Sequence, residues 1–119
     1  MRFNKSSVWE EISQIIKEKG HGYFIVYPAQ SSQKFTGERD YYHIIYEINY
    51  INSIGAVENT TASRKYELES DMDNIGARYI ISIDVVVEHI VDRDIVYEDK
   101  VIIGTVKSPI YEQYKHKLR

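Results

Sequence analysis

Residues 41–51 read YYHIIYEINYI, and this stretch decides the fold. Alternate positions collect aromatic and β-branched side chains, namely Tyr42, Ile44, Tyr46, Ile48 and Tyr50. The positions between them are more polar: Tyr41, His43, Ile45, Glu47 and Asn49. A period of two with such residues on one side is typical of a half-buried β-strand. We therefore expect a strand here, with Tyr42, Tyr46 and Tyr50 in the core and Tyr41 on the exposed side.

A second alternating stretch follows at residues 77–91, ARYIISIDVVVEHIV, and predicts the longest strand. Asp92-Arg93-Asp94 has the composition of a turn, so residues 95–106 are expected to return as a partner strand. Glu98-Asp99-Lys100 interrupts the alternation of that partner, which predicts a bulge or a further turn there.

The remaining strand signals are shorter. Residues 22–27 form an apolar run that ends at Pro28 and predict a buried strand, followed by a polar loop over 28–40. Residues 52–63 are small and polar and predict a connection. Residues 64–70 alternate and predict a short strand, and 71–76 (DMDNIG) predict a turn.

Helices are expected at both ends of the chain. Ser7 and Glu10 have the spacing of a capping box, and apolar residues recur at helical spacing through 6–20. Pro109 is suited to the first turn of a short helix over 109–118. The order predicts an α+β fold, in which the N-terminal helix packs on a curved, mostly antiparallel sheet of four or five strands, with a short C-terminal helix.

Length and composition limit the class of protein. A chain of 119 residues with 43% hydrophobic and 28% charged residues is expected to form a single domain, 1–119. The absence of cysteine excludes disulfides and thiolate chemistry, and the net charge of −3 argues against a nucleic-acid partner. No apolar run is long enough for a membrane span and no signal peptide is evident, so we expect a cytoplasmic or intracellular protein. The alternative location is a virion.

The acidic residues around 67–73 raise the question of a metal site. Carboxylates are the ligands that Ca²⁺ prefers, but an EF-hand loop that begins at Asp71 would place Ile75 and Ser82 at ligand positions. A solvated, charged turn is therefore the prediction, and we expect neither a metal nor a cofactor.

One pattern raises the possibility of catalysis. Asp94 followed by Glu98-Asp99-Lys100 resembles the Asp…Glu-x-Lys arrangement of metal-dependent nucleases, in which two carboxylates hold Mg²⁺ and a lysine supports the attacking water. The alternative is a charged hairpin edge.

Two histidines have defined places in the expected strands. His43 and Glu47 lie four residues apart on one face, where they form either an acid–base pair or, as we expect, polar partners across strands. His89 is on the apolar side of its strand and is expected to be a hydrogen-bonded structural residue.

The clearest pointer to function is an uneven charge distribution. Residues 107–119 carry four basic side chains against Glu112, a net +3, so the rest of the chain carries −6. A basic terminal helix can contact an acidic protein surface, a neighbouring subunit or a phosphate backbone, or can simply compensate the helix dipole. The candidate interaction residues are Tyr41, Tyr111, Tyr114, Lys115, Lys117 and Arg119.

Two functional hypotheses follow. The first is a non-catalytic structural, assembly or inhibitor-type protein, which binds a protein partner or itself and derives from a phage or mobile element. The second is a metal-dependent phosphodiesterase or nuclease that uses Asp94, Glu98 and Lys100.

Overall fold

The computed structural model describes residues 3–20 and 40–118, and it contains the strand expected at 41–51. In chain order the elements are α1 (Lys5–Lys19), β1 (Asp40–Ile51), β2 (Val57–Ala62), α3 (Lys65–Ile75), the 3-10 turn η2 (Ala77–Tyr79), β3 (Ile80–Val91), β4 (Asp94–Lys107), α4 (Tyr111–Tyr114) and the 3-10 turn η3 (Lys115–Lys117). The expected strand 22–27 and nearly all of the loop 28–40 lie outside the described residues.

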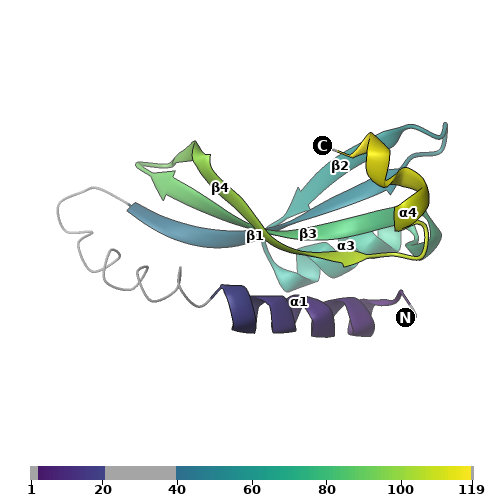
Figure 1. The fold of residues 1–119 in the computed structure, drawn as a ribbon, viewed down its shortest axis with the longest axis horizontal. Coiled ribbons are helices and arrows are strands. Elements are labelled where there is room, and N and C mark those ends of the chain that lie inside the picture. Colours follow the sequence, from purple (N-terminus) through teal and green to yellow (C-terminus); the bar gives the residue numbers. More distant parts are fainter. Residues whose placement is uncertain (1–2, 21–39, 119) are drawn as a thin grey trace.

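Within the described residues, the sheet has four antiparallel strands in the order β2-β1-β3-β4 (Figure 1). It is curved but open. β1 pairs with both of its neighbours, with Tyr46 opposite Val85 and Ile48 opposite Ile83. The fold is therefore α+β as expected, with a helix at each end of the strand region.

The β3–β4 hairpin turns at Asp92 and Arg93, whose φ angles are 50° and 73°. Two successive positive φ angles are typical of a type I′ turn, which matches the twist of the flanking strands. The turn expected at 92–94 is thus confirmed, and it uses two residues rather than three.

Helix α1 begins one residue before the expected start, and Asn4 is its N-cap. The Asn4 side chain accepts hydrogen bonds from the backbone N–H and the hydroxyl of Ser7. The predicted capping box with Ser7 as cap is therefore wrong, because Asn4 is already extended and its short carbonyl side chain reaches the first turn.

The stretch 64–76 is the main correction. Residues 65–75 form helix α3, where we predicted a strand and a turn. Leu68 and Met72, four residues apart, are buried on one side of this helix, whereas Tyr66 is 63% exposed. Glu67 accepts hydrogen bonds from the Ser63 backbone N–H and hydroxyl, which stabilises the start of the helix and lowers the pKa of Glu67.

Two smaller corrections concern the strands. Residues 57–62 form the edge strand β2, where we predicted only a connection. Residues 77–79 form η2 rather than the beginning of β3, and Tyr79 is consequently exposed instead of belonging to the buried face.

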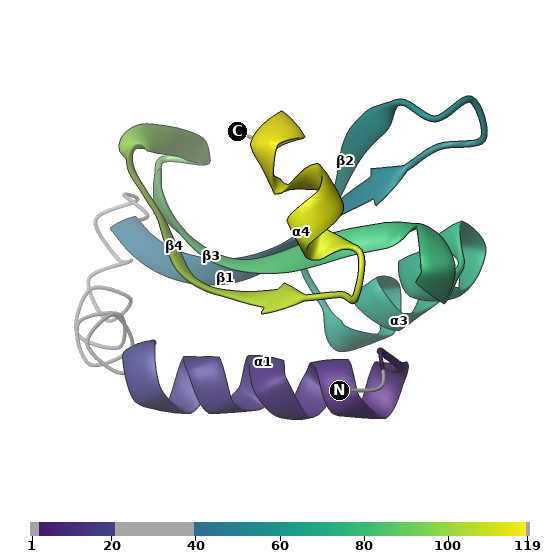
Figure 2. The ribbon, with the colours of Figure 1, turned by 45° about the vertical axis from the view of Figure 1, so that its right-hand side comes forward.

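The core lies between the sheet and the two longer helices. Figure 2 shows α1 and α3 against one face of the sheet and α4 on the side opposite α1. Val8 and Ile12 of α1 pack into a cluster with Tyr46, Ile48 and other buried residues of the sheet. The ring of Trp9 meets that of Tyr46 edge to face, with centroids 5.9 Å apart. Tyr42 and Tyr50 pack against the cluster, as expected. We call this side the covered face and the opposite side the open face.

Candidate functional site

A row of hydrogen-bonded polar side chains crosses all four strands on the open face. Asn59 of β2 donates to Asn49 of β1 at 2.9 Å, and Asn49 donates to Asp84 of β3 at 3.2 Å. Thr105 of β4 donates to the other carboxylate oxygen of Asp84 at 2.7 Å. Asn49 also donates to the buried Ser82 hydroxyl at 3.1 Å. We call Asn59, Asn49, Asp84 and Thr105 the polar row.

The predicted bulge is present in β4, and it positions a lysine over the sheet. His89 pairs with Val96 and Val87 pairs with Val101, so residues 97–100 lie opposite a single residue of β3. This extra chain length lets the Lys100 ammonium reach across β3 to Glu47 of β1 at 2.8 Å. The hydrogen bond to the Glu47 carboxylate raises the pKa of Lys100, so Lys100 is a fixed cation at neutral pH.

The same bulge is held on its other side by a histidine. Asp99 is 2.7 Å from His89 Nδ1, and the His89 ring stacks on Tyr42 with centroids 4.5 Å apart. Asp99 and Lys100, although adjacent, are therefore bound to partners on different strands. The expectation that His89 is a hydrogen-bonded structural residue is confirmed.

His43 and Glu47 do not pair with each other. His43 Nε2 is 2.9 Å from the buried Glu88 carboxylate, while Glu47 binds Lys100. Each is thus one member of a cross-strand polar pair, as we expected in preference to an acid–base pair.

The open face forms the floor of a groove of about 980 Å³. The residues that line it come from β1, β2, β3, β4 and the C-terminal segment: Glu47, Asn49, Val57, Glu58, Asn59, Asp84, Tyr97, Lys100, Ile102, Lys117 and Leu118. Two apolar side chains in its lining point largely into solvent, since Tyr97 is 71% exposed and Ile102 is 52% exposed. The groove therefore combines a hydrogen-bonded polar floor with an exposed apolar margin.

The C-terminal segment is held against the sheet by its first residues. The Ser108 backbone N–H donates to the carbonyl of Ile81 at 3.0 Å, and Ser108 itself is buried. From this anchor the chain turns back over the open face as α4 and η3 (Figure 2). Lys117 and Leu118 line the groove, while Ile110, Gln113 and Tyr114 line a second hollow at the end of the sheet.

Four of the predicted interaction residues lie in this segment, and each contacts another side chain: Tyr111, Tyr114, Lys115 and Lys117. The Lys107 ammonium lies 4.9 Å from the centre of the Tyr111 ring, and that of Lys117 lies 5.8 Å from the Tyr114 ring. Lys115 forms an exposed ion pair with Glu112, which raises the pKa of Lys115. Arg119 and the side chain of Tyr41 lie outside the described residues. The interaction role of all six residues stays a prediction.

Asp94, Glu98 and Lys100 are not arranged as the two carboxylates and the lysine of a metal-dependent nuclease would be. Asp94 and Glu98 are exposed, and neither lines the groove or the second hollow. Lys100 binds Glu47. Across residues 3–20 and 40–118, no three histidine or carboxylate side chains come together as a metal site would need.

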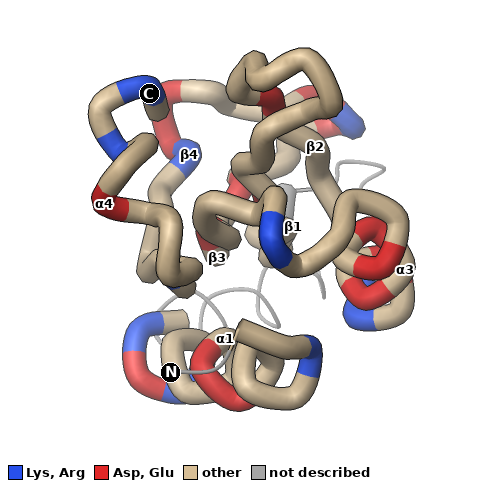
Figure 3. Tube along the Cα trace, turned by 90° about the vertical axis from the view of Figure 1, so that its right-hand side faces the viewer, with Lys and Arg blue, Asp and Glu red and all other residues tan. Residues whose placement is uncertain are grey.

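The acidic residues of 67–73 belong to α3 rather than to a turn. Figure 3 shows acidic positions along this helix, whereas several basic positions lie near the C-terminus. Asp73 is paired with Lys5 of α1 at 3.0 Å. The uneven charge distribution of the sequence is therefore also a spatial one.

None of the helices in the described part of the chain combines the length and apolar composition that crossing a membrane requires. Comparison with protein-family models, with curated proteins and with solved structures finds no match for this chain.

The polar row was not predicted from the sequence. Its hydrogen-bonded pairs are 10, 35 and 21 residues apart along the chain, and only the register of the four strands brings them together. The available signal was the alternation of 41–51 and 77–91, which places Asn49 and Asp84 on the polar sides of their strands.

Proposed function

We propose that this protein acts by binding another protein chain and catalyses no reaction itself, with the groove on the open face as its contact surface. The observation that carries the proposal is the exposure of Tyr97 and Ile102 beside the hydrogen-bonded floor of the groove. Tyrosine is enriched among the residues that dominate binding energy at protein interfaces, because its ring buries a large area and its hydroxyl keeps a polar partner.

The polar floor supports the same proposal. Asp84 and Asn49 are engaged with neighbouring strands, and Glu47 is engaged with Lys100. A partner that covers these groups meets side chains that already have hydrogen-bond partners, so the cost of removing water from them is reduced. An interface with an apolar margin and a satisfied polar centre needs only a few anchor residues for its affinity.

The charge of the groove indicates the kind of partner. Three carboxylates and two lysines line it, and the Glu47–Lys100 pair is already neutralised internally. A surface of nearly balanced charge favours a polar protein surface over a nucleic-acid backbone, which requires several unpaired cations. Self-association, and an origin in a phage or mobile element, stay predictions.

The proposal is tested with a crosslinker placed in the groove. A photoreactive phenylalanine replaces Tyr97 in one variant and Tyr66 in a matched control, since both tyrosines are strongly exposed and only Tyr97 lines the groove. We expect irradiation in the native host to yield a discrete protein adduct from position 97 and none from position 66. Light scattering of the purified protein then decides whether the adduct is a second copy.

A second variant separates contact from folding. Tyr97→Ser combined with Ile102→Ser removes the exposed apolar margin and leaves the polar row intact. We expect the adducted protein to lose its binding to this variant, whose circular dichroism spectrum should be unchanged. Equal binding by the unchanged protein and the variant would refute the groove as the contact surface.

A further inference from the structure

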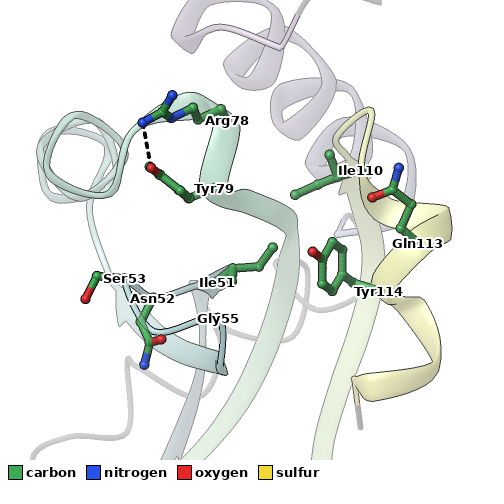
Figure 4. Close-up of a pocket in the computed structure, with 9 residues that line it drawn as sticks. All are labelled: Ile51, Asn52, Ser53, Gly55, Arg78, Tyr79, Ile110, Gln113 and Tyr114. Carbon is green, nitrogen blue, oxygen red and sulfur yellow. Dashed lines mark hydrogen bonds between the residues drawn. The ribbon is translucent and has the colours of Figure 1, made fainter.

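A second hollow, separate from the groove, lies at one end of the sheet. Its volume is about 450 Å³. It is bounded by the end of β1, the β1–β2 turn, η2 and the C-terminal segment, and its lining residues are Ile51, Asn52, Ser53, Gly55, Arg78, Tyr79, Ile110, Gln113 and Tyr114 (Figure 4). We call it the end notch.

The lining of the end notch combines aromatic and aliphatic side chains with polar ones. Figure 4 shows Tyr79 and Tyr114 on opposite sides of the hollow, with Ile51 between them and Ile110 next to Tyr114. Tyr114 and Ile110 come from the C-terminal segment, whereas Ile51 and Tyr79 come from the sheet and η2.

One cation lies at the edge of the end notch. Arg78 donates one hydrogen bond to the Tyr79 hydroxyl at 2.6 Å, and its guanidinium carbon lies 4.7 Å from the centre of the Tyr79 ring. Arginine has five N–H donors in a planar fork. Among the described residues, no carboxylate forms an ion pair with Arg78. The guanidinium is thus held by the tyrosine while most of its donors stay available.

The side chains that line the end notch carry a net positive charge, whereas those that line the groove carry a small net negative charge. Arg78 is the one charged side chain among the nine lining residues, whereas three carboxylates line the groove. The Asn52 side chain points away from the hollow in Figure 4, and its oxygen accepts hydrogen bonds from the backbone N–H groups of Ile54 and Ala56. The end notch therefore presents one positive charge beside two tyrosine rings.

The geometry points to the end notch as a binding site for a carboxylate next to an apolar side chain, within a peptide segment of a partner protein. Arg78 would bind the carboxylate through its guanidinium fork, as arginine does in bidentate pairs. Tyr79 and Tyr114 would hold the neighbouring apolar side chain. A nucleic-acid backbone fits less well, because a single cation in a chain of net charge −3 gives little attraction for a polyanion. The end notch shares no lining residue with the groove. This inference therefore does not rest on the function proposed for the groove.

The test uses short peptides as probes and the full chain as the receptor. One probe is acetyl-Ala-Leu-Glu-Leu-Ala-amide, and its uncharged counterpart carries Gln in place of Glu. A third, acetyl-Ala-Leu-Ala-Leu with a free carboxyl end, distinguishes a chain terminus from an acidic side chain. Binding is followed by nuclear magnetic resonance, with the backbone signals of Ile51, Tyr79 and Tyr114 as reporters. We expect at least one carboxylate probe to shift these signals and the Gln peptide to leave them unchanged.

Two arginine variants then assign the contact. Arg78→Gln should weaken carboxylate binding by roughly ten-fold or more, the loss that follows from removing a hydrogen-bonded charge partner. Arg64→Gln is the matched control, because Arg64 is also exposed and lies outside the end notch. It should bind as the unchanged protein does, and so should Tyr97→Ser in the groove.

The outcomes are distinct. Binding of both carboxylate probes, or of either one alone, with dependence on Arg78 supports the proposal and identifies the source of the carboxylate. Equal binding of the Gln peptide, an effect of Arg64→Gln equal to that of Arg78→Gln, or no binding of any probe would overturn it. Inorganic phosphate that binds more tightly than either peptide would overturn the carboxylate assignment in favour of a phosphate site.

Discussion

Helix α1 packs against the sheet at Gly104 of β4 through Ile15, and replacing Gly104 with alanine gives a sharp test of that packing. A Cβ atom at position 104 would lie 2.7, 2.8 and 2.9 Å from three side-chain carbons of Ile15. Carbon atoms in van der Waals contact are about 3.5–4.0 Å apart. The added methyl group therefore requires a displacement of roughly 1 Å between α1 and β4.

Ile15 cannot easily turn away to make this room. A β-branched side chain in a helix has one strongly preferred χ1 rotamer, so the helix itself has to shift. Overpacking of this kind costs about 1–3 kcal/mol. We expect Gly104→Ala to lower the free energy of unfolding by that amount, and the melting temperature by about 3–5 °C for each kcal/mol.

The assay is equilibrium urea unfolding followed by circular dichroism, performed as a double-mutant cycle with Ile15→Ala. Removing the Ile15 side chain leaves space for the new methyl group, so Gly104→Ala should cost less than about 0.5 kcal/mol in the Ile15→Ala background. The expected coupling is at least about 0.5 kcal/mol. Strictly additive effects of the two substitutions would refute the described contact between α1 and β4.

Three further predictions concern a helix cap, a turn and alkaline pH. Asn4→Ala removes the acceptor for the Ser7 N–H and should destabilise the protein by about 0.5–2 kcal/mol in thermal unfolding. Arg93→Gly should stabilise the protein by about 0.5–1 kcal/mol, because relief of the positive φ at residue 93 outweighs the added entropy of glycine in the unfolded chain. A loss of stability in this variant would contradict the type I′ turn. Burial raises the pKa of Tyr46, and an ion pair raises that of Lys100. Both groups are protonated in the folded state, so the stability they contribute is complete below pH about 10 and is lost as the pH rises further. Unfolding midpoints measured from pH 9 to 12 should fall less steeply for Lys100→Met than for the unchanged protein.

The long alternating stretches made β1, β3 and the α+β class predictable. Strands 41–51 and 77–91 extend over many residues, so a period of two is unambiguous, and only the first three residues of the second stretch were wrong. Helix α1 was predictable because its apolar residues recur at helical spacing over many residues. Its cap was not, because Asn4 and Ser7 both have side chains that can cap a helix.

Helix α3 was missed because its sequence supports two periods. Tyr66 and Leu68 alternate with charged residues, whereas Leu68, Met72 and Ile75 have helical spacing. Burial of Leu68 and Met72 against the core decides in favour of the helix, and that burial depends on tertiary packing. β2 was missed for a related reason, since an edge strand with few apolar residues gives almost no pattern.

The candidate site was predictable only in its basic C-terminal part. Lys117, one of the predicted interaction residues, lines the groove, and its interaction role stays a prediction. The polar row and the end notch depend on strand register and on chain reversals, which bring together residues from distant parts of the sequence.

The C-terminal segment from Ile110 to Leu118 lines both the end notch and the groove, and this shared wall has a thermodynamic consequence. Any ligand that displaces the segment when it binds in one hollow also alters the other. The two affinities are then linked, and each ligand changes the affinity of the other by the same factor. The Ser108–Ile81 hydrogen bond fixes the start of the segment, so such a change would be transmitted through the residues that follow it, from Ile110 in the end notch to Leu118 in the groove.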